Sequence, residues 1–377
     1  MHPVLTNKDL SVKTDVVNNS KTTSTLDQLE LAYQVGLLSQ EHKNLHSMSK
    51  SGLLPCSSRH ASTLLANYTH PYLYSFQQRL SNAPTNYFLA IDITLFHHNG
   101  PSIEGIAPYY TSQGNYWGLS VATAVLVSPK KKILPYPIGF MPNLRPYLHT
   151  STYPSMTPSE VALSIARKVS KQHLIKGVIM DGGMIKRSQL YKLRCHGIPF
   201  VAHIPNSHVV KYTKKQVYGT KKEIKAIAGI NIKNLANLFP PNKIRWYPKL
   251  ECYAKKIKVY LPNVGKVWLM IIWWRKGTGV ELFVLVFTTE GIGVQEIIRA
   301  YKARWGDEVM HRLVKQNLGA QACQSPNFAV QMKHLDLCIS AFGKVREYLI
   351  EHSNLSFREA QIQVSKKLQK LVFAPHK

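Results

Sequence analysis

The chain has 377 residues, and its 48 lysines and arginines outnumber its 20 aspartates and glutamates, which gives a formal net charge of +28. With 45% hydrophobic and only 18% charged residues, the sequence can build a sizeable core, which excludes a disordered polybasic protein. A charge of this size indicates a polyanionic partner, and we expect nucleic acid. Because acids are scarce, a carboxylate inside an apolar segment is a candidate for function.

The sequence also argues against several other classes of protein. The five cysteines are scattered without a C-x-x-C pair, so we expect neither a disulfide scaffold nor a zinc finger. No apolar signal segment begins the chain, and the most apolar run, Val267–Trp274, is far shorter than the ~20 residues that span a bilayer. We therefore expect no membrane partner and a cytoplasmic protein associated with the nucleoid.

The N-terminal part is expected to be helical. Residues 1–24 are polar and are typical of a loose arm. Apolar residues at helical spacing from Thr25 to Leu38, and again at about 62–80, predict helices. We interpret residues 1–85 as an N-terminal arm with a helical DNA-binding unit.

From residue 86 the pattern becomes that of an α/β core. The run NYFLAIDITLF predicts a strand buried on both faces, and 133–147 is a proline-rich stretch. Alternating strands and helices then favour an α/β fold. Further strands are expected at 102–110, 119–127, 177–180 and 198–205, and helices at 157–174 and 188–197.

A β-rich segment interrupts this core at 207–285. It begins with the basic run KYTKKQVYGTKKEIK, and helices follow it at 294–319 and 327–351. We divide the rest of the chain as follows: first core part 86–206, β-rich insertion 207–285, second core part 286–352, basic C-terminal tail 353–377.

Two acids occupy strand positions. Asp92 lies within the apolar strand, on the same face as Thr94, and an ionised carboxylate there is costly unless it is paired. Asp181 follows the strand GVIM, at the carboxyl end where α/β folds place functional groups. Each also has an ordinary interpretation, Asp92 as a buried structural acid and Asp181 as a turn residue.

Helical spacing adds a third acid. At about 100° per residue, one set of polar residues falls within an arc of about 80°. This set is Tyr301, Arg304, Glu308, Arg312 and Lys315. The adjoining apolar face consists of Ile298, Trp305, Val309 and Leu313. Asp307 falls off both stripes, which favours Glu308 over its neighbour. The alternative is a solvated helix face with an Arg304–Glu308 ion pair.

Tyr301, Arg304, Glu308 and Lys315 match the pattern Y-x2-R-x3-E-x6-K. In this the chain resembles the IS4-type superfamily of DDE transposases, with its YREK signature. LAIDITLF is similar to that family's first-acid strand, and TPSEVALSIARKV…GVIMDGG to the helix and strand before its second acid. The resemblance covers roughly residues 86–320. The chain departs from the family at the two glycines after Asp181 and at Gly306.

The resemblance implies an RNase H-like mixed sheet flanked by helices, with the β-rich insertion placed before the third-acid helix. It also implies a transposase that cuts transposon ends and joins the freed 3′-hydroxyl to target DNA. The expected catalytic residues and ligands of Mg²⁺, with Mn²⁺ as a substitute, are Asp92, Asp181 and Glu308. Tyr301, Arg304 and Lys315 would hold phosphates, and Arg312 is a further DNA-binding candidate. The expected partners are double-stranded DNA and, on DNA, a second copy of the chain.

The insertion holds two adjacent tryptophans, Trp273 and Trp274, whose side chains should point to opposite faces of a strand. We expect one of them to face outward beside Arg275 and Lys276, where it could stack on a displaced base. The alternative is that both are buried between the insertion and the core.

Two other functions stay open at this point. A metal-dependent nuclease that only cuts would use the same three acids. A non-catalytic DNA-binding protein fits the charge equally well, but it does not predict acids at three motif positions.

Overall fold

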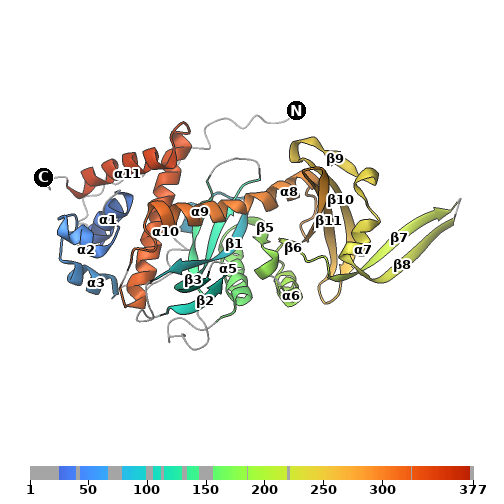
Figure 1. Ribbon diagram of the computed structural model, residues 1–377, viewed down its shortest axis with the longest axis horizontal. Coiled ribbons are helices and arrows are strands. Elements are labelled where there is room, and N and C mark those ends of the chain that lie inside the picture. Colours follow the sequence, from blue (N-terminus) through green and yellow to red (C-terminus); the bar gives the residue numbers. More distant parts are fainter. Residues whose placement is uncertain are drawn as a thin grey trace.

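The computed structural model describes residues 25–39, 43–66, 79–98, 105–111, 114–129, 134–143, 156–184, 186–218, 221–323 and 325–373. The molecule is elongated: the N-terminal helices lie at one end, and a two-stranded hairpin projects from the other (Figure 1). One mixed sheet runs between these two ends.

A single sheet contains all the described strands. Its main path is β2-β3-β1-β5-β6-β12-β11-β10-β7-β8, with β4 beside β3 and β9 beside β10. The strands of the first core part are β1 (Tyr87–His97), β2 (Ala107–Thr111), β3 (Gly114–Val127), β4 (Tyr136–Pro142), β5 (Ile175–Met180) and β6 (Phe200–His203). Those of the β-rich part are β7 (Val209–Tyr218), β8 (Lys221–Asn231), β9 (Arg245–Tyr247), β10 (Cys252–Leu261), β11 (Gly265–Lys276) and β12 (Gly279–Phe287).

The centre of the sheet is parallel. β1 pairs with β5, and β5 with β6, in parallel, whereas β3 and β12 flank this group in antiparallel pairings. Consecutive residues of β1 from Phe88 to Ile91 are fully buried. Because neighbouring residues of a strand point to opposite faces, both faces of the central sheet are covered.

The helices surround this sheet and form the two ends of the chain. They are α1 (Thr25–Leu38), α2 (Leu45–Lys50), α3 (Ser58–Ala66), α5 (Pro158–Gln172), α6 (Arg187–Cys195), α7 (Ile232–Asn237), α8 (Val294–Ala303), α9 (Trp305–Asn317), α10 (Phe328–Glu351) and α11 (Phe357–Val372). Both α5 and α9 pack against β1 and β3. None of the helices described is long and apolar enough to cross a membrane.

The predicted start of α5 is confirmed. The Thr157 side chain accepts from the backbone N–H of Glu160, and the Glu160 carboxylate accepts from that of Thr157, which forms a capping box before Pro158. The helix predicted at 62–80 begins earlier, at Ser58, and α3 ends at Ala66. Residues 67–78 of that prediction lie outside the described part of the chain, as does the predicted arm at 1–24.

Two segments contain structure that the sequence analysis did not assign. The proline-rich stretch contains the strand β4, which lies off the main path of the sheet, where the missing N–H of a proline is tolerated. Residues 353–377 were expected to be a basic tail, yet they contain α11, which starts with a Ser356–Glu359 capping box. This helix is tied to the N-terminal part, because Gln361 donates a hydrogen bond to the carbonyl of Leu38 (2.9 Å).

The β-rich segment continues the sheet of the core. β12 pairs with β6 through Leu285 and His203, and β11, β10, β7 and β8 follow outward from it. The hairpin β7–β8 forms the projecting end of the molecule (Figure 1). Most of the basic run at 211–225 lies in these two strands, but the side chains of residues 213–228 lie outside the described part.

Candidate active site

Asp92 and Asp181 are brought side by side by the central strands. Ile91 of β1 is the partner of Met180 of β5, so the next residue along each parallel strand is an aspartate. Paired positions on neighbouring parallel strands point to the same face. The backbone supports both carboxylates: Asp92 Oδ1 accepts from the N–H of Ile93 (2.9 Å), and Asp181 Oδ1 from that of Gly182 (2.7 Å).

Arg304 joins the first and third acids. Its guanidinium lies 3.1 Å from Glu308 Oε1 and 3.7 Å from Asp92 Oδ2, and its side chain is only 13% exposed. The Arg304 Nε atom is buried and has no hydrogen-bond partner among the described residues. An unused donor next to partly exposed carboxylates is suited to an incoming acceptor such as a phosphate oxygen.

The other two signature residues contact the same group. The Tyr301 hydroxyl donates to Asp181 Oδ1 (3.3 Å), and Lys315 Nζ donates to the hydroxyl of Thr94 (2.7 Å), two residues beyond Asp92. Helices α8 and α9 and the residue between them, Arg304, therefore direct three polar side chains toward the acid-bearing strands. Arg312, the fifth member of the predicted polar face, is exposed on α9.

The electrostatics reflect this concentration of charge. Burial raises the pKa of Asp92, and Glu308 and Asp181 act in the same direction, while the Ile93 N–H and Arg304 oppose them. Burial by itself would lower the pKa of Arg304, but Tyr301 and the three carboxylates outweigh it and raise that pKa. Burial lowers the pKa of Lys315, with Asp92 opposing the shift. The site therefore holds several carboxylates around one guanidinium.

Asp307 contradicts the helical-wheel argument. It was predicted to lie off both stripes, but it is fully buried. The buried residues of α9 are Asp307, Met310, His311 and Val314, whereas Trp305, placed on the apolar stripe, is 58% exposed. One reason is the junction at Arg304, where N–H groups bond to carbonyls three residues back and so wind the helix more tightly. The other is that α9 buries polar side chains against β3.

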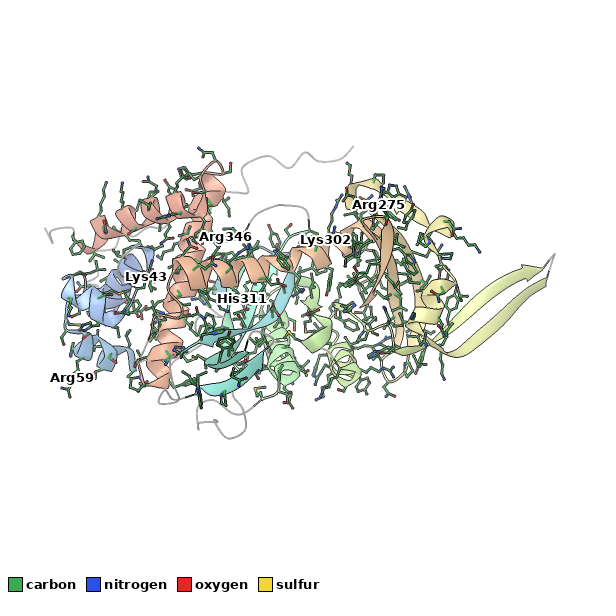
Figure 2. The ribbon with its side chains drawn as sticks, viewed as in Figure 1. Lys43, Arg59, Arg275, Lys302, His311 and Arg346 are labelled. Atoms are coloured by element: carbon green, nitrogen blue, oxygen red, sulfur yellow. The ribbon has the colours of Figure 1, made fainter. Side chains whose placement is uncertain are left out.

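Trp273 and Trp274 are both half-buried, so neither is the fully exposed indole that was expected, and neither is fully buried. The Trp273 indole donates to the carbonyl of Phe239 (3.0 Å). Lys302 of α8 lies over the ring of Trp274, with its Nζ atom 4.2 Å from the centroid (Figure 2). The exposed indole nearest to the acids in sequence is instead Trp305, which sequence reasoning assigned to the interior.

His203 is a neighbour of the site that sequence reasoning missed. It ends β6, and its ring stacks on Phe283 (centroids 4.3 Å apart, planes at 13°). A Cβ atom on Gly182 would lie 2.7 Å from its Nδ1 atom, so only a glycine fits after Asp181. This explains the first of the two glycines by which the chain departs from the family pattern.

The donor atoms at this site suit a divalent cation. Carboxylate oxygens are the preferred ligands of Mg²⁺, and partly buried, mutually repelling acids gain from an added positive charge. Within the described residues, no three acidic, histidine or cysteine side chains lie close enough to hold a metal ion together. Arg304 lies between Asp92 and Glu308 instead. The residues fit the cation in chemistry and in charge.

A basic and aromatic face lies on the insertion. Lys256 and Lys258 of β10 lie over the ring of Trp268 on β11, with Nζ atoms 4.3 and 5.3 Å from its centroid. Lys258 is exposed, and Lys256 also donates to the carbonyl of Ile292 just before α8. This face therefore adjoins the start of the helix that carries Tyr301.

Comparisons with known proteins find a matching family and a similar fold. The family described as the transposase DDE domain matches residues 150–342, more than half of the chain, and this segment includes Asp181 and Glu308 but not Asp92. Among solved structures, the chain is similar to a piggyBac transposase in a synaptic complex with hairpin DNA. The TM-score is 0.50 at 11% identity, over 98% of this chain and 77% of the other. This likeness confirms the expected RNase H-like fold. No curated protein matches the sequence.

Proposed function

This chain belongs to the DDE transposases, DNA-processing enzymes that generally depend on a divalent metal, and we propose that Asp92, Asp181 and Glu308 are its catalytic carboxylates. The assignment rests on the contacts that connect the three carboxylates with Tyr301 and Arg304. Arg304 contacts Asp92 and Glu308, and Tyr301 of the same helical segment contacts Asp181. The YREK residues support placing the chain in the IS4-type superfamily.

Mg²⁺, with Mn²⁺ as a substitute, is the cofactor that we propose, and the three carboxylates would hold it. When bound, it activates the attacking oxygen and stabilises the leaving oxygen of an in-line displacement at phosphorus. Arg304 would turn part of its donor set, including the free Nε, from the acids to a DNA phosphate.

The same site would perform two successive displacements. In the first, the oxygen of water bonds to phosphorus, and the P–O3′ bond at the transposon end breaks, which leaves a 3′-hydroxyl and a 5′-phosphate. In the second, this 3′-hydroxyl attacks a phosphorus of target DNA and displaces a 3′-oxygen there. Lys315, held by Thr94, and Tyr301 would keep the DNA backbone in line.

Double-stranded DNA would be the main partner, with transposon ends and target bound in turn. The N-terminal helices (residues 25–66) and the basic face of the insertion would bind DNA outside the cleavage site, as would the exposed Arg312. Two transposon ends must be cut and joined together, so we propose a homodimer assembled on DNA. A protein that acts on chromosomal DNA would be found on the nucleoid. The half-burial of Trp273 and Trp274 favours a packing role over base stacking for both.

The test uses the full chain with DNA taken from both sides of its gene, where inverted repeats are expected, and a supercoiled target. Asp92→Asn, Asp181→Asn and Glu308→Gln should each abolish Mg²⁺-dependent cleavage while keeping their affinity for end DNA. Glu296→Gln is the matched control, because Glu296 is a partly exposed acid of α8 that pairs with Lys176. Cleavage without strand transfer would indicate a nuclease instead. Binding with neither activity would indicate a DNA-binding protein.

A further inference from the structure

A buried polar cluster lies where α9 packs on β3. Asp307 is fully buried, Thr123 is 2% exposed and His311 is 7% exposed. The Thr123 hydroxyl lies 3.0 and 3.2 Å from the two Asp307 carboxyl oxygens and 2.6 Å from His311 Nε2. His311 lies on the sheet side of α9 (Figure 2). Burying three polar groups is costly unless each is satisfied by another, and here one hydroxyl serves both helix residues.

The two helix residues also contact each other directly, with His311 Nε2 3.3 Å from Asp307 Oδ1. Burial raises the pKa of Asp307 well above its usual range, and Asp92 adds to the shift. Burial also lowers the pKa of His311 to about 3. The Thr123 hydroxyl donates to the Asp307 carboxyl, and it also lies within hydrogen-bond distance of His311 Nε2. The three side chains therefore contact one another in every pair, and this hydrogen-bond geometry fixes their relative positions more narrowly than apolar contacts do.

The location of the cluster between two acid-bearing elements is more informative than its contribution to folding stability. Thr123 is the residue of β3 directly opposite Asp92 in the β1–β3 ladder, and its hydroxyl lies 3.4 Å from the backbone oxygen of Asp92. On the helix side, Asp307 immediately precedes Glu308. The same three groups therefore touch the strand that carries the first acid and the helix turn that carries the third.

We propose that Thr123, Asp307 and His311 are positioning residues, which fix the rotation and height of α9 on the sheet and thereby set Glu308 against Asp92. This inference rests on the proposed roles of those two acids. A helix held only by apolar side chains could settle at neighbouring rotations, and misplacement by 1 Å is enough to impair catalysis. Residues that hold metal ligands in place typically affect metal affinity or activity ~10- to 100-fold.

The experiment measures Mn²⁺ binding to the full chain by electron paramagnetic resonance, and then single-turnover cleavage of end DNA. Thr123→Val removes the hydroxyl at nearly constant shape, whereas Thr123→Ser keeps it. Asp307→Leu removes the polar group, whereas Asp307→Asn keeps a polar side chain of nearly the same shape. Tyr33→Phe is the matched control, because it removes another buried hydrogen bond (2.7 Å, to His334 Nδ1) between α1 and α10.

Thr123→Val and Asp307→Leu should weaken Mn²⁺ binding ~10- to 100-fold and slow cleavage at saturating metal. Thr123→Ser and Asp307→Asn should bind and cut like the unmodified chain. Tyr33→Phe should lower the unfolding temperature without changing Mn²⁺ affinity, which separates positioning from stability.

Three results would overturn the inference. Thr123→Val could bind Mn²⁺ as tightly as the unmodified chain. Tyr33→Phe could lose as much Mn²⁺ affinity as Thr123→Val. Asp307→Asn could lose binding as completely as Asp92→Asn, which would make Asp307 a ligand. If Asp92→Asn binds Mn²⁺ as tightly as the unmodified chain, the proposed function itself is refuted. Failure of this inference can therefore be distinguished from failure of the proposed function.

Discussion

Replacing Gly182 by alanine should damage the site through His203. The added Cβ would lie 2.7 Å from His203 Nδ1, which is 0.7 Å short of the 3.4 Å at which ordinary contact begins, and 3.1 Å from the His203 backbone oxygen. The ring cannot move away easily, because it stacks on Phe283 and its strand pairs with β12. The displacement therefore falls on Gly182 and on Asp181 next to it.

Two magnitudes follow for Gly182→Ala. Overpacking of this kind costs about 1–3 kcal/mol of unfolding free energy. A shift of the Asp181 carboxylate by somewhat less than 1 Å should slow cleavage by about 10- to 100-fold, since 1 Å can cost about 100-fold. The assay is single-turnover cleavage of end DNA at saturating Mg²⁺, with unfolding by urea measured on the same samples.

The control is Gly279→Ala, where the nearest atom would lie 3.9 Å from the new Cβ. The double variant Gly182→Ala with His203→Ala should recover part of the rate lost by Gly182→Ala, because only the backbone contact at 3.1 Å then persists. The reasoning is refuted if Gly182→Ala cuts as fast as Gly279→Ala. It is also refuted if removing the His203 ring gives no recovery.

Two other predictions concern DNA binding and acid stability. If the basic surface contacts about eight phosphates, a plot of log K, the association constant for DNA, against log salt concentration should have a slope near −7. Lys258→Ala should make this slope shallower by about 0.9. A slope near zero would show that DNA is not the main partner. Burial lowers the pKa of His334 to about 4 and that of His311 to about 3, from 6.5. Below pH 6.5 the unfolded chain therefore binds more protons than the folded chain does. As the pH drops from 6.5 toward 4, the free energy of unfolding should fall by up to about 1.4 kcal/mol per pH unit for each histidine. Urea titrations from pH 7 to 5 would show this loss, and His334→Gln should make it shallower; an unchanged slope would contradict the assignment.

The sequence was informative wherever the signal is local. The position of Asp92 in a buried strand, of Asp181 after another, and of the capping box at Thr157 each depend on neighbouring residues. Helical spacing placed Tyr301, Arg304 and Lys315 on one face with Glu308, and the family resemblance implied their position beside the other two acids. These features need no knowledge of which segments meet in space.

The incorrect predictions concern residues whose burial or contacts depend on residues far away in the sequence. Asp307 is buried because Thr123, 184 positions away, offers it a hydroxyl, and no periodicity reveals that contact. Trp305 is exposed even though its hydrophobicity predicts burial. His203 lies in an ordinary apolar strand, and only the approach of Gly182 identifies it.

The way the β-rich segment joins the sheet separates the part that would hold DNA from the strands that carry the acids. It leaves the core after His203 and returns at Leu285, and these two residues are direct partners on neighbouring strands. Because exit and return are adjacent, the intervening segment can lengthen or shorten without moving the strands that carry the acids. Such a segment can acquire a new hairpin, like β7–β8, and reach new stretches of DNA while the cutting chemistry stays fixed. The choice of DNA that the chain binds can therefore change independently of the cleavage chemistry.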